Sequence, residues 1–381
     1  MRRGLPALLT ALALAVPARA DNAGVTAVPI LQVPLWARAA GMGTAFTAVA
    51  SDASSLFYNP AGMARLNAQE LGVTFAQGVG DSSLQSYAYA GPTPFTGVSG
   101  NGYTSVGATL LYARNGNIEV NTLNTDGSLG KSENKSAGSD LVAAAGYAER
   151  VGMTPLELRE GTFQLDHYLG ATGKYVRSSI IDKSASTYAT DVGYLAHAPE
   201  LGVTCGASLL NLGGKIRYDQ QDDPLPKTVR SGFAWQGGVP SIHYWLAALD
   251  ADYVLDERQW HVNVGGEYFW VKTYGVRLGY QINRDDGGLT VGFGLRWRGR
   301  VLVDYAWGLG RLFRDSHRIT ISYRFGGVPP SQRSRQRRPF IEQGPEHEEF
   351  RDLQEQMPKI ETPRPRLVPR ERGDGVPGWI Y

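Results

Sequence analysis

The sequence has a single cysteine, Cys205, among its 381 residues. One thiol cannot form an intramolecular disulfide, and it cannot supply a zinc site built from cysteines. Long apolar runs are also missing beyond the first twenty residues. No stretch there approaches the ~18 apolar residues of a membrane-spanning helix, and the mean hydropathy is −0.25. These absences exclude a disulfide-stapled protein and a helical membrane protein.

An excess of charge of either sign is missing too, with 38 Lys and Arg against 36 Asp and Glu. A net charge of +2 gives no electrostatic reason to expect nucleic acid as a partner. The sequence contains no G-x-S-x-G or H-E-x-x-H motif, and Gly41-Met42-Gly43 does not open a dinucleotide-binding fingerprint. The histidines lack the spacing of metal ligands; they are His167, His197, His243, His261, His317 and His347. We therefore expect no catalytic residue, no metal and no cofactor.

The first twenty residues, MRRGLPALLTALALAVPARA, have the pattern of a secretory signal peptide. Arg2 and Arg3 precede an apolar stretch, and Ala18-Arg19-Ala20 forms a small-x-small cleavage signal. A short uncleaved membrane anchor is the alternative, although the apolar run is short for crossing a bilayer. The pattern predicts export past the inner membrane, with the mature chain beginning at Asp21.

Three regions follow this signal. Residues 21–68 become dense in Ala, Gly and Ser from Ala37 onward and show no alternation. Residues 69–327 consist of short alternating runs separated by Gly, Asn, Asp and Pro, which is typical of strands and turns. Residues 328–381 are rich in proline and arginine, which predicts a disordered tail.

The middle region contains fourteen candidate strands, most of them about ten residues long or longer. That length suits a tilted membrane-spanning strand of ~9–11 residues better than the five or six of an average soluble strand. Tight connections at 272–273 and 299–300 contrast with long ones at 115–138 and 214–226, as in outer-membrane barrels. The candidates are 69–77, 84–92, 102–114, 139–151, 162–180, 187–199, 201–213, 227–237, 242–256, 260–271, 274–283, 289–299, 301–310 and 315–325.

Alternation within these runs predicts which side chains meet lipid. In 289–299, Val291, Phe293, Leu295 and Trp297 share one face, because side chains repeat every two residues along a strand. A soluble sandwich alternates in the same way. The aromatics near strand ends and the mixed charges on the opposite face favour a transmembrane barrel that is apolar outside and polar inside.

The inward-facing charges are of mixed sign. Because charges in a partly dry lumen need partners, we expect structural ion pairs; a row that conducts substrate is the alternative. The set comprises Asp250, Asp252, Glu267, Arg277, Arg296, Arg298, Asp304, Arg318 and Arg324.

The last predicted strand ends in Tyr323-Arg324-Phe325. Tyr323 and Phe325 resemble the insertion signal that the barrel assembly machinery recognises on the final strand of many barrels. An ordinary edge strand is the alternative interpretation.

Two sets of short motifs carry a family resemblance. The first joins 37–46 (ARAAGMGTAF) to 59–63 (NPAGM). The second runs from 207–213 (ASLLNLG) through Leu225-Pro226, 266–268, 277–280 and 304–306 to 322–325. In order and spacing they are similar to the PorV/PorQ family of outer-membrane proteins, relatives of the FadL-type fatty-acid transporter fold. The resemblance covers about residues 37–327 and does not extend to the tail.

This resemblance implies a fourteen-stranded barrel with an N-terminal segment in its lumen and both ends of the barrel domain on the periplasmic side. Fourteen strands leave a lumen that must be filled, since only about eight strands are closed by their own side chains. The segment 21–68 is the available plug. In FadL-type relatives a hydrophobic ligand passes beside such a plug. Residues that could touch a ligand, or simply anchor the plug to the wall, are Phe46, Leu56, Phe57, Tyr58, Asn59, Pro60 and Met63.

Three functions remain open at this point. The resemblance favours an accessory of type IX-like protein secretion, whose partners are outer-membrane lipid, the barrel assembly machinery and secretion-system proteins. The second is passive uptake of long-chain fatty acids or other hydrophobic small molecules. The third is a structural barrel whose tail, with its Arg and Glu blocks, recruits a periplasmic partner.

Overall fold

A computed structural model describes residues 24–78, 81–100, 103–126, 128–159, 161–239, 242–284, 287–310 and 315–326. All of them belong to one compact unit, Met1–Gln332. The expectations for the signal peptide (1–20) and the tail (328–381) lie outside the described residues.

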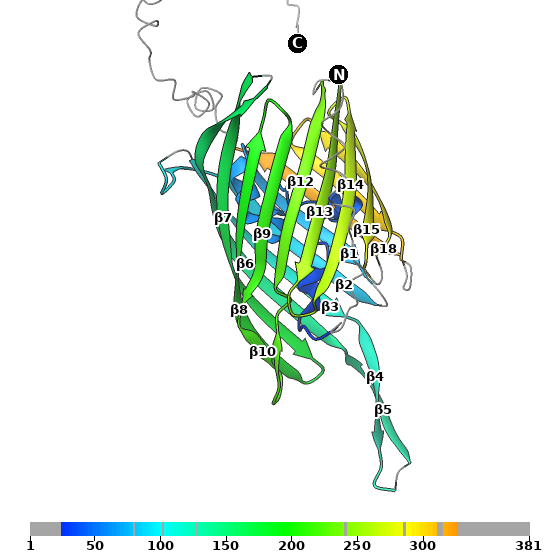
Figure 1. Ribbon diagram of the computed structural model, residues 1–381. Coiled ribbons are helices and arrows are strands. Elements are labelled where there is room, and N and C mark those ends of the chain that lie inside the picture. Colours follow the sequence, from blue (N-terminus) through cyan, green and yellow to red (C-terminus); the bar gives the residue numbers. More distant parts are fainter. Residues whose placement is uncertain are drawn as a thin grey trace, which may run out of the picture. The chain divides into compact units, whose positions relative to one another are not determined.

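Fourteen antiparallel strands form a closed barrel, which confirms the predicted fold class (Figure 1). Each strand pairs with the next along the circuit, and β1 closes the circuit by pairing with β18, from Gln69 opposite Phe325 to Gln77 opposite His317. No helix in the described part of the chain is long and apolar enough to cross a membrane. The wall strands are β1 (Gln69–Gln77), β2 (Ser82–Thr96), β3 (Tyr103–Asn115), β6 (Gly138–Leu158), β7 (Gly161–Ile180), β8 (Lys183–Ala198), β9 (Val203–Gly213), β12 (Thr228–Val239), β13 (His243–Val254), β14 (Gln259–Trp270), β15 (Tyr274–Ile282), β16 (Leu289–Trp297), β17 (Val301–Gly308) and β18 (Ser316–Phe325).

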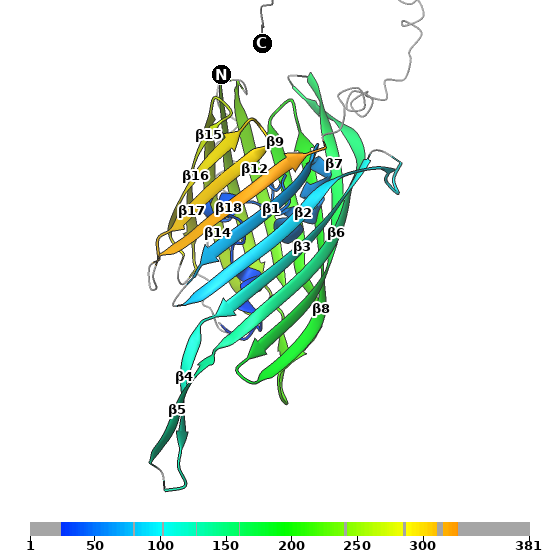
Figure 2. The ribbon, with the colours of Figure 1, turned by 180° about the vertical axis from the view of Figure 1, so that it is seen from behind.

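The wall is uneven in height (Figure 2). β6 and β7 contain 21 and 20 residues, whereas β17 contains 8. The two long connections contain small sheets of their own, which the sequence did not predict. They are β4 (Asn117–Leu123) with β5 (Leu129–Ser136), and β10 (Lys215–Arg217) with β11 (Asp222–Pro224).

Both small sheets lie at the same end of the barrel, which we call the loop end. The opposite end, where β1 begins and β18 ends, we call the terminal end; tight turns such as 271–273 and 298–300 join strands there. In Figure 1 the β4–β5 hairpin extends well beyond the wall.

The outer face of the wall is apolar, as the alternation predicts. Val276, Leu278 and Phe293 point away from the lumen, and their side chains are 50%, 57% and 53% exposed. Aromatic side chains gather near both ends of the strands, with Trp270 and Trp297 toward the terminal end. Because this apolar surface cannot face water over a whole barrel, it is the surface that meets lipid.

Cys205 also faces outward and is exposed. On β9 the inward positions are even-numbered, such as Thr204, Gly206 and Ser208, so residue 205 falls on the exposed face. The side chain lies opposite Phe233 of β12.

The lone thiol provides a direct test of the barrel's orientation. A fluorophore attached to Cys205 in urea, before refolding into vesicles, should be quenched by lipids that carry a nitroxide and not by aqueous iodide. A fluorophore on Lys183→Cys in a Cys205→Ser background should show the reverse, because Lys183 is exposed at the loop end. Iodide quenching at Cys205 would show that the apolar face does not meet lipid.

Candidate functional site

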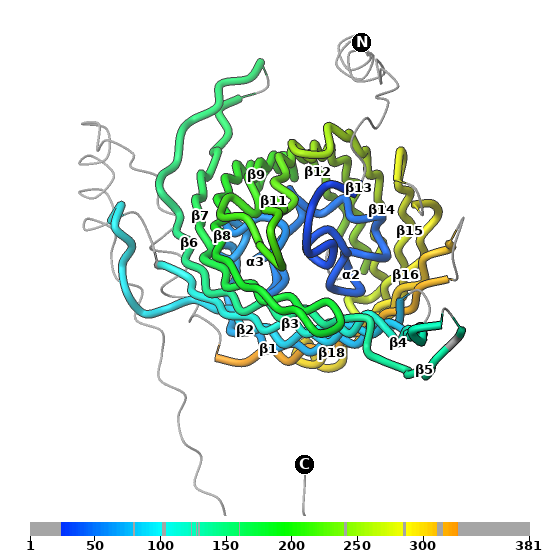
Figure 3. Tube along the Cα trace, turned by 90° about the horizontal axis from the view of Figure 1, so that it is seen from below, coloured from blue at the N-terminus to red at the C-terminus, as the bar shows by residue number. Residues whose placement is uncertain are grey.

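Residues 24–68 run through the lumen of the barrel as short turns and helices (Figure 3). The helical pieces are η1 (Pro29–Gln32), α2 (Ala37–Gly41), α3 (Ser55–Tyr58) and η2 (Pro60–Arg65). Pro60 suits the first position of η2, where no amide is needed, and the side chain of Asn59 accepts a hydrogen bond from the Ala61 amide. We call residues 24–68 the plug.

The seven plug residues singled out from the sequence are all buried. Their contacts are structural ones. Phe46 and Tyr58 pack edge to face at 5.2 Å between ring centroids. Asn59 donates from Nδ2 to the carbonyls of Thr47 in the plug and Tyr194 in β8, both at 3.0 Å. Phe57 and Tyr58 also line a small cavity of about 40 Å³. The contacts above anchor the plug, and a ligand role for the seven residues stays a prediction.

Wall glycines form the seat on which the plug backbone lies. A Cβ atom at Gly206 would come within 2.6 Å of the Thr47 carbonyl oxygen, and one at Gly170 would overlap the backbone of Pro60 and Ala61. The glycines also face one another across neighbouring strands. Four directly opposed pairs lie against the plug: Gly107–Gly146, Gly170–Gly193, Gly206–Gly232 and Gly265–Gly279.

Sequence reasoning missed this seat. Glycine recurs at inward positions of most strands, which is visible in the sequence, but the direct pairing depends on a strand register that the sequence does not give. Each glycine lets the wall approach the plug by roughly the width of a side chain.

A buried carboxylate, Glu267 of β14, joins the plug to the wall by ion pairs. Arg38 of α2 binds it through two parallel hydrogen bonds, Nε to Oε2 and Nη2 to Oε1, both 2.9 Å long. Arg277 of β15 donates to the same carboxylate at 2.7 Å and reaches Asp304 of β17 at 2.7 Å. Arg38 also pairs with Asp52 inside the plug at 3.1 Å. We call these five residues the Glu267 clamp.

A second cluster lies on β12 and β13. Asp250 accepts hydrogen bonds from the backbone amides of Phe46 and Thr47, at 2.8 and 2.7 Å. Arg230 donates to Asp252 at 2.8 Å and to the Thr44 carbonyl at 3.1 Å. Two wall side chains thus satisfy polar backbone groups of the plug that its turns leave unpaired.

A third cluster, on β7 to β9, was not expected. Lys174 pairs with Asp191 at 2.6 Å and donates to Asn211 Oδ1 at 2.8 Å, and its ammonium lies over the Phe57 ring. The strand register shifts here, between Thr190 and Val192, and Asn211 has a φ of 60°.

The remaining predicted luminal charges occupy different places. Arg324 pairs with Glu70 at 2.7 Å, and Arg318 donates to the Pro34 carbonyl at 2.9 Å. Arg296 lies 3.8 Å from the centre of the Phe269 ring. Arg298 is not luminal: β16 ends at Trp297, so alternation stops there, and Arg298 is an exposed turn residue with a φ of 50°.

Sequence analysis did not single out several charged residues of these three clusters: Arg38, Asp52, Arg230, Lys174 and Asp191. Tyr323 and Phe325 stack on the outer face with ring centroids 5.8 Å apart; their role as an insertion signal stays a prediction. Within the described ranges, no group of His, Cys, Asp or Glu is arranged to hold a metal ion.

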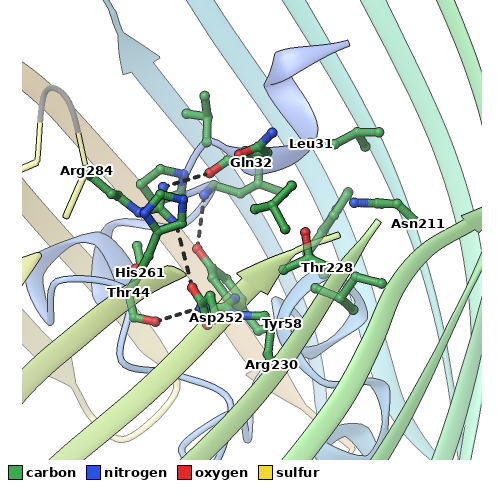
Figure 4. A pocket seen from close by; sticks show the side chains of 16 residues that line it. Leu31, Gln32, Thr44, Tyr58, Asn211, Thr228, Arg230, Asp252, His261 and Arg284 are labelled. Atoms are coloured by element: carbon green, nitrogen blue, oxygen red, sulfur yellow. Dashed lines mark hydrogen bonds and ion pairs between the residues drawn. The ribbon is translucent and has the colours of Figure 1, made fainter. Parts of the chain in front are cut away.

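Two cavities lie on the loop-end side of the plug. The smaller, of about 40 Å³, is enclosed by Leu31 to Leu35, Tyr58, Arg230, Asp252, His261 and Arg284 (Figure 4). The larger, of about 580 Å³, opens at the loop end and is lined by Gln32, His261, Arg284 and Arg318 together with Ile30, Val33, Leu84 and Leu309. Plug residues 32–34, which we call the strap, line both cavities, as do His261 and Arg284.

Removing Arg38, one of the two cations of the Glu267 clamp, should lower the free energy of unfolding. Arg38→Ala leaves Glu267 and Asp52 with fewer partners in a buried site, which costs about 3–5 kcal/mol. The urea midpoint of the refolded barrel should fall accordingly. Lys183→Gln removes an exposed pair with Asp219 and should cost less than about 1 kcal/mol; equal effects of the two changes would contradict the clamp.

The glycine seat can be tested on a single strand. Gly170→Val places a side chain where the backbone of Pro60 lies, so the plug should be displaced and planar bilayers should show steady ion conductance. Gly173→Val is the matched control, because a Cβ there meets nothing within 4 Å. We expect Gly173→Val to remain as closed as the unmodified protein; a closed Gly170→Val barrel would refute the seat.

Known structures share this architecture at low sequence identity. The toluene transporter TbuX of Ralstonia pickettii is 11% identical, with a TM-score of 0.51; the match covers 76% of this chain and 98% of that one. A FadL homologue of Pseudomonas aeruginosa is 12% identical over 77% and 99% of the two chains, with a TM-score of 0.43. The likeness to TbuX supports the barrel fold alone. No curated protein matches the sequence significantly.

The family comparison goes further. The family model described as type IX secretion system protein PorV matches residues 17–237, which include the plug and the wall as far as β12. The match agrees with the resemblance carried by the motifs in 37–63 and 207–213. It covers more than half of the chain, and the chain therefore belongs to the PorV family of outer-membrane β-barrels.

Proposed function

We propose that this protein is a closed, non-enzymatic barrel that serves type IX protein secretion by docking exported proteins at its loop end. The observation that carries the proposal is the fixed plug. Two polar clusters on the wall bind it by ion pairs and hydrogen bonds, the Glu267 clamp and Asp250 with Arg230, and the Lys174 ammonium lies over the Phe57 ring. A barrel blocked in this way is better suited to presenting a surface than to conducting a solute.

The continuous strand pairing of the wall also supports a closed barrel. Pairing is continuous around the circuit, and the register shift between β8 and β9 is filled by Asp191, which accepts from the Asn211 amide at 2.7 Å. A hydrophobic ligand that leaves sideways needs a gap between neighbouring strands, and opening one between paired strands exposes backbone groups to lipid at several kcal/mol each.

The loop end offers the docking surface. The β4–β5 hairpin projects beyond the wall, and its two strands pair only with each other, from Asn117 opposite Ser136. The sheet of β10 and β11 lies at the same end. If the barrel has the family orientation, with the terminal end in the periplasm, these segments face the cell exterior, where an exported protein emerges.

Uptake of hydrophobic molecules is the second candidate, and the 580 Å³ cavity favours it. Ile30, Val33, Leu84 and Leu309 give that cavity an apolar side. Beyond the strap, however, the space falls to about 40 Å³, room for one or two water molecules. A tail that recruits a periplasmic partner is the third candidate, and it lies outside the described residues.

Native purification separates the candidates. The full-length protein, cross-linked in cells and purified from the outer membrane, should bring secretion-system or exported proteins with it. Replacing 117–136 with a short Gly-Asn turn should abolish this association and leave the barrel folded, because the hairpin pairs with no wall strand. Deleting 328–381 should not abolish it. Bound fatty acid without protein partners would instead support uptake.

A further inference from the structure

The outer face of β3 and β7, which is otherwise mostly apolar, carries one arginine on each strand near the loop end. Arg114 follows Tyr112 by two residues on β3, and Arg177 follows Tyr175 by two residues on β7. All four side chains therefore point out of the barrel, and both arginines are exposed and nearest the loop end. On both strands, therefore, an outward tyrosine is followed by an outward arginine that lies nearer the loop end.

These two cations have no carboxylate partner among the described residues, whereas the neighbouring lysines do. Arg114 donates to the side-chain oxygen of Asn117 at 2.9 Å, and Arg177 makes no ion pair. Nearby, Lys135 pairs with Asp182 at 3.1 Å, and Lys183 pairs with Asp219 at 2.7 Å. The cations nearest the lipid-facing wall are thus the ones left without a carboxylate.

The strand register brings the two arginines together across β6. Arg114 lies opposite Ser139, Ser139 lies opposite Ser179, and Arg177 is two residues from Ser179 on the same face. The hydroxyls of Ser139 and Ser179 hydrogen-bond at 2.9 Å. Ideal sheet spacings put the two arginine Cα atoms about 12 Å apart. Side chains of arginine length can converge over that distance on one anionic headgroup or on two neighbouring ones.

Below this polar patch the wall becomes apolar and aromatic again. Leu141, Tyr175 and Tyr188 share the outward face on the side away from the loop end; Tyr188 is 72% exposed and packs against Tyr175. An arginine on the lipid-facing side costs about 2–4 kcal/mol at the bilayer midplane and close to nothing near the interface. The patch is therefore placed where headgroups lie, with acyl chains beside the rings.

We propose that Arg114, Arg177, Ser139 and Ser179 bind the phosphate groups of lipid A, the glycolipid of the outer leaflet. Guanidinium groups bind phosphate through paired hydrogen bonds. Because the two hydroxyls hydrogen-bond each other, one O–H of the pair is left to donate to a phosphate. The proposal does not depend on a secretory role. It depends on the loop end facing the cell exterior, because the outer leaflet is the one that carries lipid A.

The test uses the full-length protein refolded in neutral detergent micelles. Adding lipid A should raise the temperature at which the folded barrel unfolds, as seen by its mobility on a gel. Lipid A stripped of phosphate should not. Arg114→Gln with Arg177→Gln should raise the half-saturating lipid A concentration at least tenfold, while Arg114→Lys with Arg177→Lys should keep part of the effect.

The matched control is Lys135→Gln with Lys183→Gln, which removes two cations of the same end that already have carboxylate partners. It should respond to lipid A as the unmodified protein does. The proposal is overturned if the arginine variant responds equally well, if phosphate-free lipid A stabilises as strongly, or if phosphatidylglycerol stabilises as strongly as lipid A. The last outcome would assign the patch to the inner leaflet.

Discussion

A wall that crosses a bilayer must pair every backbone amide and carbonyl within itself, and this requirement closes the fourteen strands into a ring. Closing that many strands creates a lumen larger than the wall's own side chains fill. The plug fills this lumen. The inward glycines, the Glu267 clamp and the paired acids of β13 all adapt the wall to the segment that fills it.

The way the plug is held differs around the ring. Toward β3, β6 and β7 the contacts are close packing, with Leu56 and Met63 against Gly107 and Gly146. Toward β12 to β17 such packing is joined by hydrogen bonds and ion pairs, centred on Asp250 and Glu267. Because a buried charge that loses its partner is expensive, the second side is the one that fixes the plug's position. The closed lumen follows from that side, and the proposed docking role rests on it.

The strands of the wall could be predicted from the sequence, whereas the contacts inside the lumen could not, and the reason is physical. Alternation is a local property, so runs such as 274–283 and 315–325 could be located closely, and the outward direction of Phe293 and Trp297 followed from it. The partnership of Arg38 with Glu267 joins residues far apart in the chain and depends on where the plug lies. Arg298 was assigned inward because alternation was extended one residue past the end of β16. The β4–β5 hairpin was missed because most of its residues are polar, and Ile118 and Val120, which share one face of β4, are not buried.

The unequal strand lengths impose a condition on the surrounding membrane. Nine residues at a tilt of about 35–45° span roughly 21–24 Å of height, so the side built from β15, β16 and β17 is slightly shorter than the apolar band of about 25 Å on outer-membrane barrels. A hydrocarbon layer thicker than that span is compressed next to the short side, and not beside the longer strands β6 and β7. A neighbouring membrane protein that covers the short side relieves the compression, which makes it the side on which such a neighbour gains most from contact.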